Sequence, residues 1–183
     1  MADRVAIFID GAYLEYVLKD DFGMPRISFE QLSASMAGDG SILRTCYYHC
    51  PPYQGNPPTT EEKQRYDARR RFYTSLDRLP RFTVRLGRLE FRGTGADGKP
   101  RFEQKRVDIL LGVDLVQLAA KGKIDQAILL AGDSDFIPAV IAAKSEGVLV
   151  RLFHGASVHS DLWQEVDERV KFDADFIKSI TIT

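Results

Sequence analysis

Short runs of apolar residues, each bounded by a polar or Gly-containing turn, alternate along the chain with segments of helical periodicity. The strand-like runs cover residues 5–9, 42–49, 127–131 and 148–153. Runs this short are typical of strands in a sheet that helices cover on both faces, as in parallel sheets. The helical segments between them are long enough to serve as crossover connections. The pattern therefore predicts an α/β fold, a three-layer α/β/α sandwich with a mainly parallel sheet.

Capping and breaking residues mark the helical segments. Helices are expected over residues 13–18, 28–37, 59–79, 107–120 and 139–146, with a further helix start at residue 161 and a terminal helix or edge strand over 176–182. Ser28 with Gln31 and Thr59 with Glu62 have the spacing of a capping box. The helix over 107–120 is apolar nearly all round, which predicts that it is buried.

Two segments do not fit the alternation of strands and helices. Residues 51–58 contain four prolines and are expected to form a loop of a length that often carries function. Residues 82–91 and 101–105 are strand-like and flank the Gly-rich turn at 93–98. This arrangement predicts a hairpin or an extended flap.

Composition narrows the class of protein. With 183 residues, 44% of them hydrophobic, the chain is expected to form a single domain over residues 1–183. With a net charge of −1, the protein as a whole does not attract nucleic acid or an anionic membrane, so binding to either needs a local basic patch. Apolar runs are too short to span a bilayer and no signal peptide is evident, which predicts a cytoplasmic protein without a membrane partner. Cys46 and Cys50 are expected to be buried thiols.

Acidic residues gather where the predicted strands end. Asp10 follows the first strand, and Asp133 and Asp135 follow the strand over 127–131. The carboxyl ends of parallel strands share one edge of a sheet, which is where open α/β sheets bind ligands. Asp108 lies in the first turn of a helix, where it is either a capping residue or a member of the same cluster. Asp114 lies in mid-helix among apolar neighbours, where a carboxylate needs a partner or a metal.

Four carboxylates sharing one pocket repel one another and need cations. Oxygen ligands without nearby His or Cys favour Mg²⁺ or Mn²⁺ over softer metals. Such a site activates water and holds the oxygens of a phosphodiester during its displacement. Clustered Arg on the helix over 59–79, at Arg69, Arg70 and Arg71, is either a solvated face or a rim that contacts phosphate.

Three segments of the chain resemble the signature segments of the NYN domain, a branch of the PIN-like nucleases. They are Phe8-Ile9-Asp10-Gly11, then Lys105-Arg106-Val107-Asp108 with Val113-Asp114-Leu115, then Ala131-Gly132-Asp133-Ser134-Asp135-Phe136. The resemblance implies a Rossmann-like PIN fold and metal-dependent cleavage of RNA. We expect the RNA partner to be single-stranded, and a homo-oligomer is left open.

Carried over by position, the resemblance assigns roles to individual residues. The catalytic residues would be Asp10, Asp108, Asp133 and Asp135, and the ligands of Mg²⁺ or Mn²⁺ would be these four with Asp114. Apart from the resemblance, we expect the substrate to be contacted by residues near these aspartates and on the basic helix face, namely Tyr13, Arg69, Arg70, Arg71, Lys105 and Ser134. The chain departs from the family at Tyr13, a position where many members carry Asn.

Two other classes of protein compete with the nuclease. A phosphatase of the haloacid dehalogenase type also has an Asp at the end of its first strand, but it needs a second acid two residues later, where this chain has Ala12. A non-catalytic RNA-binding or scaffold protein could share the fold. Tyr13 and the aromatic, proline-rich segment over 47–53 favour this second class, since aromatic rings stack on unpaired bases.

Overall fold

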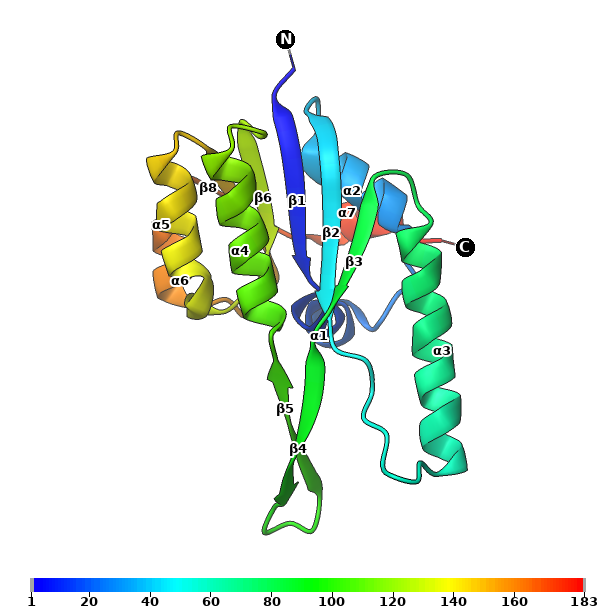
Figure 1. Ribbon diagram of the computed structural model, residues 1–183. Helices are drawn as coiled ribbons and strands as arrows, with labels where there is room; N and C mark the ends of the chain where they lie inside the picture. Colours follow the sequence, from blue (N-terminus) through cyan, green and yellow to red (C-terminus); the bar gives the residue numbers. More distant parts are fainter. Residues whose placement is uncertain (1, 183) are drawn as a thin grey trace.

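The computed structural model, which describes residues 2–182, is built on a six-stranded sheet with the order β3-β2-β1-β6-β7-β8 (Figure 1). Every neighbouring pair in this sheet is parallel. Its strands are β1 (Arg4–Asp10), β2 (Ser41–His49), β3 (Phe82–Leu86), β6 (Gln126–Leu130), β7 (Leu149–His154) and β8 (Glu168–Lys171). Because all strands run the same way, all their carboxyl ends lie at one edge.

Helices cover both faces of the sheet, so the three-layer α/β/α prediction is confirmed. The helices are α1 (Gly11–Phe22), α2 (Phe29–Ala37), α3 (Thr60–Asp77), α4 (Val107–Ala120), α5 (Ile137–Ser145), α6 (Ser160–Glu165) and α7 (Ala174–Ile180), with a short 3₁₀ turn η1 (Ser134–Phe136). One core lies between the sheet and α4, α5 and α6. The other lies between the sheet and α1, α2, α3 and α7.

Local signals set the helix starts as the sequence predicts. The Thr59 side chain accepts a hydrogen bond from the Glu62 backbone, and the Glu62 carboxylate accepts one from the Thr59 backbone. Ser28 likewise accepts from the backbone of Gln31 at the start of α2. The two cysteines are free and buried, as expected. Over residues 2–182, no helix has the length and apolar character needed to cross a membrane.

A hairpin projects from the body of the protein beyond the carboxyl edge of the sheet (Figure 1). It consists of β4 (Arg88–Thr94) and β5 (Pro100–Lys105), which pair antiparallel. We call this hairpin the arm. The sequence predicts one strand over 82–91, but the chain leaves the main sheet at Gly87. A Cβ there would lie 2.5 Å from the carbonyl oxygen of Lys105, so glycine permits the close packing at the base of the arm.

Two other expectations need correction. Helix α4 is not buried all round: Val107, Leu111, Leu115 and Ala119 face the core, whereas Ile109 is 70% exposed. Its apolar pattern therefore includes an open outer face. In the C-terminal region, the sequence pattern missed the edge strand β8, whereas α6 and α7 confirm the predicted helix start at residue 161 and the helical alternative for residues 176–182.

Candidate functional site

The predicted acidic residues occupy the carboxyl edge of the sheet through local caps. Asp10 ends β1 and caps α1, accepting hydrogen bonds at Oδ1 from the backbone N–H groups of Ala12 (3.0 Å) and Tyr13 (3.1 Å). Asp133 caps η1 and accepts one from the backbone N–H of Asp135 (3.1 Å). The end of β1 and the start of α1 coincide at Asp10, whereas Asp133 follows the end of β6 by three residues, so the backbone directs both carboxylates to this edge.

Electrostatic coupling indicates that the four carboxylates form one group. Burial raises the pKa of Asp10 to about 6, and the negative charge of Asp108 also raises it. The hydrogen bonds from the Tyr13 and Ala12 backbone and the nearby His49 act in the opposite direction. The pKa of Asp108 is raised by burial and then by the charges of Asp133 and Asp135. Mutual repulsion of this kind is relieved when a cation binds or a proton is taken up.

The side-chain positions limit how a cation could be held. Among residues 2–182, no three His, Cys, Asp or Glu side chains are placed so that they could hold one ion together. An ion bound without rearrangement would therefore have two of the carboxylates at most as direct ligands. Mg²⁺ is commonly bound in this way, through one or two carboxylates with several retained waters. The oxygen-only donor set fits Mg²⁺ or Mn²⁺.

Asp114 has partners of its own. The Tyr48 hydroxyl donates to Asp114 Oδ2 (2.9 Å), and Arg85 forms a salt bridge with the same oxygen (3.2 Å). Tyr48 is fully buried on the neighbouring strand β2. A mid-helix carboxylate was expected to need a partner or a metal, and the structure supplies partners. Asp114 thus joins α4 to β2 and β3, and these partners account for a mid-helix carboxylate without a metal, so its role as a metal ligand stays a prediction.

Two grooves flank the acidic group. The first, the Asp10 groove, has a volume of about 580 Å³ and is lined by Asp10, Tyr13, Tyr16, Gly132, Asp133, Ser157, Val158 and His159. The second, the Asp108 groove, has a volume of about 790 Å³ and lies between the base of the arm, α4 and the start of α5. Asp108 and Asp135 line the second groove together with Lys105. A chain-like ligand could therefore approach the carboxylates from either side.

Tyr13 is held firmly in place by the backbone around it. Its hydroxyl donates to the carbonyl oxygen of Ser157 (2.6 Å) and accepts from the N–H of Gly155 (3.1 Å). Burial raises the pKa of this hydroxyl to about 12. A Cβ at Gly132 would lie 2.3 Å from the Tyr13 ring, so glycine at 132 lets the ring pack against the turn that carries Asp133. Tyr13 thus connects α1 to the acidic turn.

The basic residues predicted to contact substrate do not form one surface. Arg69 forms a two-pronged ion pair with Glu15 of α1, with its second contact at 2.8 Å, and lies near the Phe72 ring. Arg70 lines a separate cavity between α3 and β3, and Arg71 is exposed. Consecutive helix residues differ by about 100° in direction, which explains the spread. The Arg69 guanidinium joins α3 to α1 through Glu15, and contact of these arginines with phosphate stays a prediction.

The remaining two predicted substrate residues lie near the carboxylates. Lys105 ends β5, pairs with Glu103 and lines the Asp108 groove. Ser134 begins η1 between Asp133 and Asp135. Both are therefore placed at the edge where the resemblance puts them.

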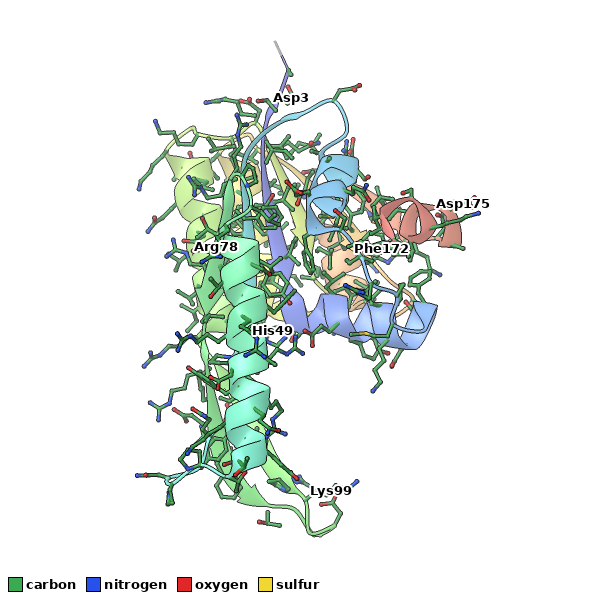
Figure 2. The ribbon with its side chains drawn as sticks, turned by 90° about the vertical axis from the view of Figure 1, so that its right-hand side faces the viewer. Asp3, His49, Arg78, Lys99, Phe172 and Asp175 are labelled. Atoms are coloured by element: carbon green, nitrogen blue, oxygen red, sulfur yellow. The ribbon has the colours of Figure 1, made fainter. Side chains whose placement is uncertain are left out.

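His49 is a feature of the site that sequence reasoning missed. It ends β2 next to Asp10 of β1, between α1 and α3 (Figure 2). Its Nε2 atom is buried without a hydrogen-bond partner and lies 3.5 Å from Glu15 Oε1. Burial favours a higher pKa for Glu15, but the hydrogen bonds and charges of His49 and Arg69 outweigh this effect and lower the pKa to about 2. The strand-edge reasoning used for Asp10 would have found His49, had it been applied to β2.

Comparisons with known proteins extend these observations. The sequence profile of the NYN domain matches residues 4–173. A crystal structure of a protein of unknown function from Vibrio parahaemolyticus is similar to the whole chain, with a TM-score of 0.63, 16% sequence identity, and coverage of 99% of this chain and 97% of that one. At this identity the likeness shows the fold alone. No curated protein matches the chain.

Proposed function

The chain belongs to the NYN domain family, and from this premise we propose that it is a metal-dependent ribonuclease that cleaves phosphodiester bonds of single-stranded RNA at the carboxyl edge of its sheet. The family is a family of PIN-like nucleases, which makes nuclease chemistry the first expectation. Asp10, Asp108, Asp133 and Asp135 are the proposed catalytic residues.

The mutual electrostatic effect of these four carboxylates carries the proposal. Asp10 has a pKa of about 6, raised first by burial and then by Asp108, and Asp108 is affected in turn by Asp133 and Asp135. Carboxylates that only cap helices have no need to lie so close to others of the same charge. A functional site is the usual reason for such an arrangement.

Mg²⁺ or Mn²⁺ would be held by members of this set, and it would supply an activated water and charge neutralisation at the phosphate. The protein side chains have separable tasks. Asp10 and Asp133 line one groove, and Asp108 and Asp135 line the other, so substrate entering either groove reaches a carboxylate. Tyr13, held by its hydrogen bonds with Gly155 and Ser157, packs its ring against Gly132 in the turn that carries Asp133.

The direct test is incubation of the purified protein with end-labelled single-stranded RNA and, separately, single-stranded DNA of the same sequence. Each is incubated with Mn²⁺, with Mg²⁺ and with chelator. We expect RNA cleavage with either ion, with Mn²⁺ at least as effective, and none in chelator. Cleavage that continues undiminished in chelator would exclude the metal-dependent mechanism. RNA binding without cleavage under every metal condition would favour the non-catalytic RNA-binding class instead.

A further inference from the structure

Three aromatic rings form a cluster on the arm, away from the two cores. Phe91 of β4 and Phe102 of β5 are directly paired across the hairpin, with ring centroids 5.9 Å apart. Tyr53, from the loop before α3, packs against both rings at 5.1 Å from Phe102 and 6.1 Å from Phe91. We call these three residues the arm cluster.

The arm cluster is more exposed than a packing role requires. Phe91 is 48% exposed and Phe102 is 42% exposed, even with Tyr53 against them. The loop that carries Tyr53 is already attached elsewhere, because the Gly55 N–H donates to the Glu62 carboxylate of α3 (3.2 Å). Two Phe rings left half open on a two-stranded hairpin cost free energy in water unless a ligand covers them.

Positive charge surrounds the arm cluster. Residues 85–106 contain seven Arg and Lys against three acidic residues, and because Arg85 is paired with Asp114, the surplus is three positive charges in a chain whose net charge is −1. Within the arm, Arg92 is paired with Glu90 and Glu103. Lys99 lies at the far end of the arm, well away from the main body (Figure 2). Exposed aromatic rings combined with local positive charge are the two components of single-strand nucleic acid binding.

The base of the arm lies next to the carboxylates at the carboxyl edge of the sheet. Residues 103–105 of β5 and the following Arg106 line the Asp108 groove, and Phe102 precedes Asp108 by only six residues. Six residues of extended chain reach about 20 Å at most. An RNA strand lying along β5 would therefore pass from the arm cluster into the Asp108 groove within a few nucleotides.

We propose that the arm is a binding platform for single-stranded RNA, on which unpaired bases stack on Phe91 and Phe102 while Arg and Lys of residues 85–106 contact the phosphates. This inference rests on the proposed function, since it describes how the substrate of that site is recognised. Stacking on aromatic rings tolerates any base. The arm would thus select unpaired strands over duplexes without selecting a sequence.

The test uses the full chain in chelator, so that cleavage does not change the probe. Binding of a fluorescein-labelled single-stranded RNA is measured by anisotropy for wild type and for the double variant Phe91→Leu/Phe102→Leu. Leucine retains apolar contact with Tyr53 but removes the stacking surface. We expect affinity to fall about tenfold or more, the lower range for loss of base stacking at two rings. The control is Leu43→Ala. Leu43 is an apolar residue of similar exposure (39%), and it lies near the start of β2, at the end of the sheet away from the arm.

A second readout detects base stacking directly and separately from affinity. RNA with 2-aminopurine at internal positions should lose fluorescence on binding wild type, because the analogue stacks on an aromatic ring. Quenching that is equal in wild type and the folded double variant, or an unchanged affinity, would overturn the proposal. A concentration-dependent dimer that the double variant loses, with RNA affinity unchanged, would assign the cluster to self-association instead.

The outcome is separable from that of the proposed function. If wild type binds RNA through the Phe residues but never cleaves it with Mn²⁺, the platform stands and the nuclease assignment fails. If wild type cleaves RNA and the double variant binds and cleaves equally well, the platform fails alone. A short RNA that cannot span from the acidic edge to Phe102 should be cleaved equally by both proteins.

Discussion

Replacing Asp10 by Asn is expected to reduce metal-dependent RNA cleavage by about a thousandfold or more, while RNA affinity stays the same or rises. Metal ions contribute several kcal/mol to phosphodiester cleavage, and each 1.36 kcal/mol of barrier corresponds to tenfold in rate. Asn keeps an oxygen that can accept from the N–H groups of Ala12 and Tyr13, so the cap of α1 survives. Only the charge is lost, and its loss favours binding of phosphate.

Single-turnover cleavage and anisotropy binding on one substrate measure the two effects separately. Asp173→Asn is the matched control, since Asp173 also caps a helix, accepting from the Phe176 N–H (2.8 Å), but lines neither the Asp10 groove nor the Asp108 groove. We expect this control to cleave like wild type. An Asp10→Asn protein that cleaves at the wild-type rate would remove Asp10 from the catalytic set.

The same Asp10→Asn change is expected to stabilise the metal-free protein, by an amount that depends on pH. The folded-state pKa of about 6 lies above the ordinary value of 3.8. Between these values the folded protein binds the proton more tightly than the unfolded chain, so this residue's contribution to stability falls as pH rises. The shift corresponds to about 3 kcal/mol at pH 7 as an order of magnitude, and Asn avoids this cost.

Thermal melts in chelator test this expectation. At pH 7 the melting temperature of Asp10→Asn should exceed that of wild type by roughly 5 °C or more, since 1 kcal/mol corresponds to about 2–4 °C in a protein of this size. The difference should vanish as the pH falls well below 3.8, because Asp10 is then protonated in both the folded and the unfolded state. Asp173→Asn should show little difference at either pH. An Asp10→Asn protein that is less stable at pH 7 would mean that the ionised carboxylate is needed for the fold.

Features of the fold and the site could be predicted from the sequence where they depend on residues that are close together in the chain. An acid at the end of a strand, as Asp10 is, or shortly after it, as Asp133 is, indicates both the parallel sheet and the edge where the carboxylates gather. The capping box of Thr59 and Glu62 fixed the start of α3 for the same reason. These features depend on residues within a few positions of one another, so the pattern contains them.

The remaining features depend on contacts between elements far apart in the sequence. Arg69 belongs to a run of three arginines, and nothing local indicates that Glu15 of α1 faces it. Asp114 could equally have met a metal or, as it does, Tyr48 of β2. The open outer face of α4 at Ile109 was hidden because an apolar helix pattern does not show how much of the helix other elements cover. Only the packing of elements resolves such alternatives.

The proposal that the carboxylates at the carboxyl edge of the sheet hold a divalent cation is tested most directly by the rise in melting temperature that Mn²⁺ induces. Asp133→Asn and Asp114→Asn each remove one negative charge, and each keeps an oxygen for its hydrogen-bond donor, the Asp135 N–H or the Tyr48 hydroxyl. Binding to the folded state alone adds about 2.7 kcal/mol of stability at a hundred times Kd. We expect this rise in wild type and in Asp114→Asn, and a greatly reduced rise in Asp133→Asn. An equal rise in all three proteins, or a loss in Asp114→Asn alone, would place the cation away from the carboxyl edge of the sheet.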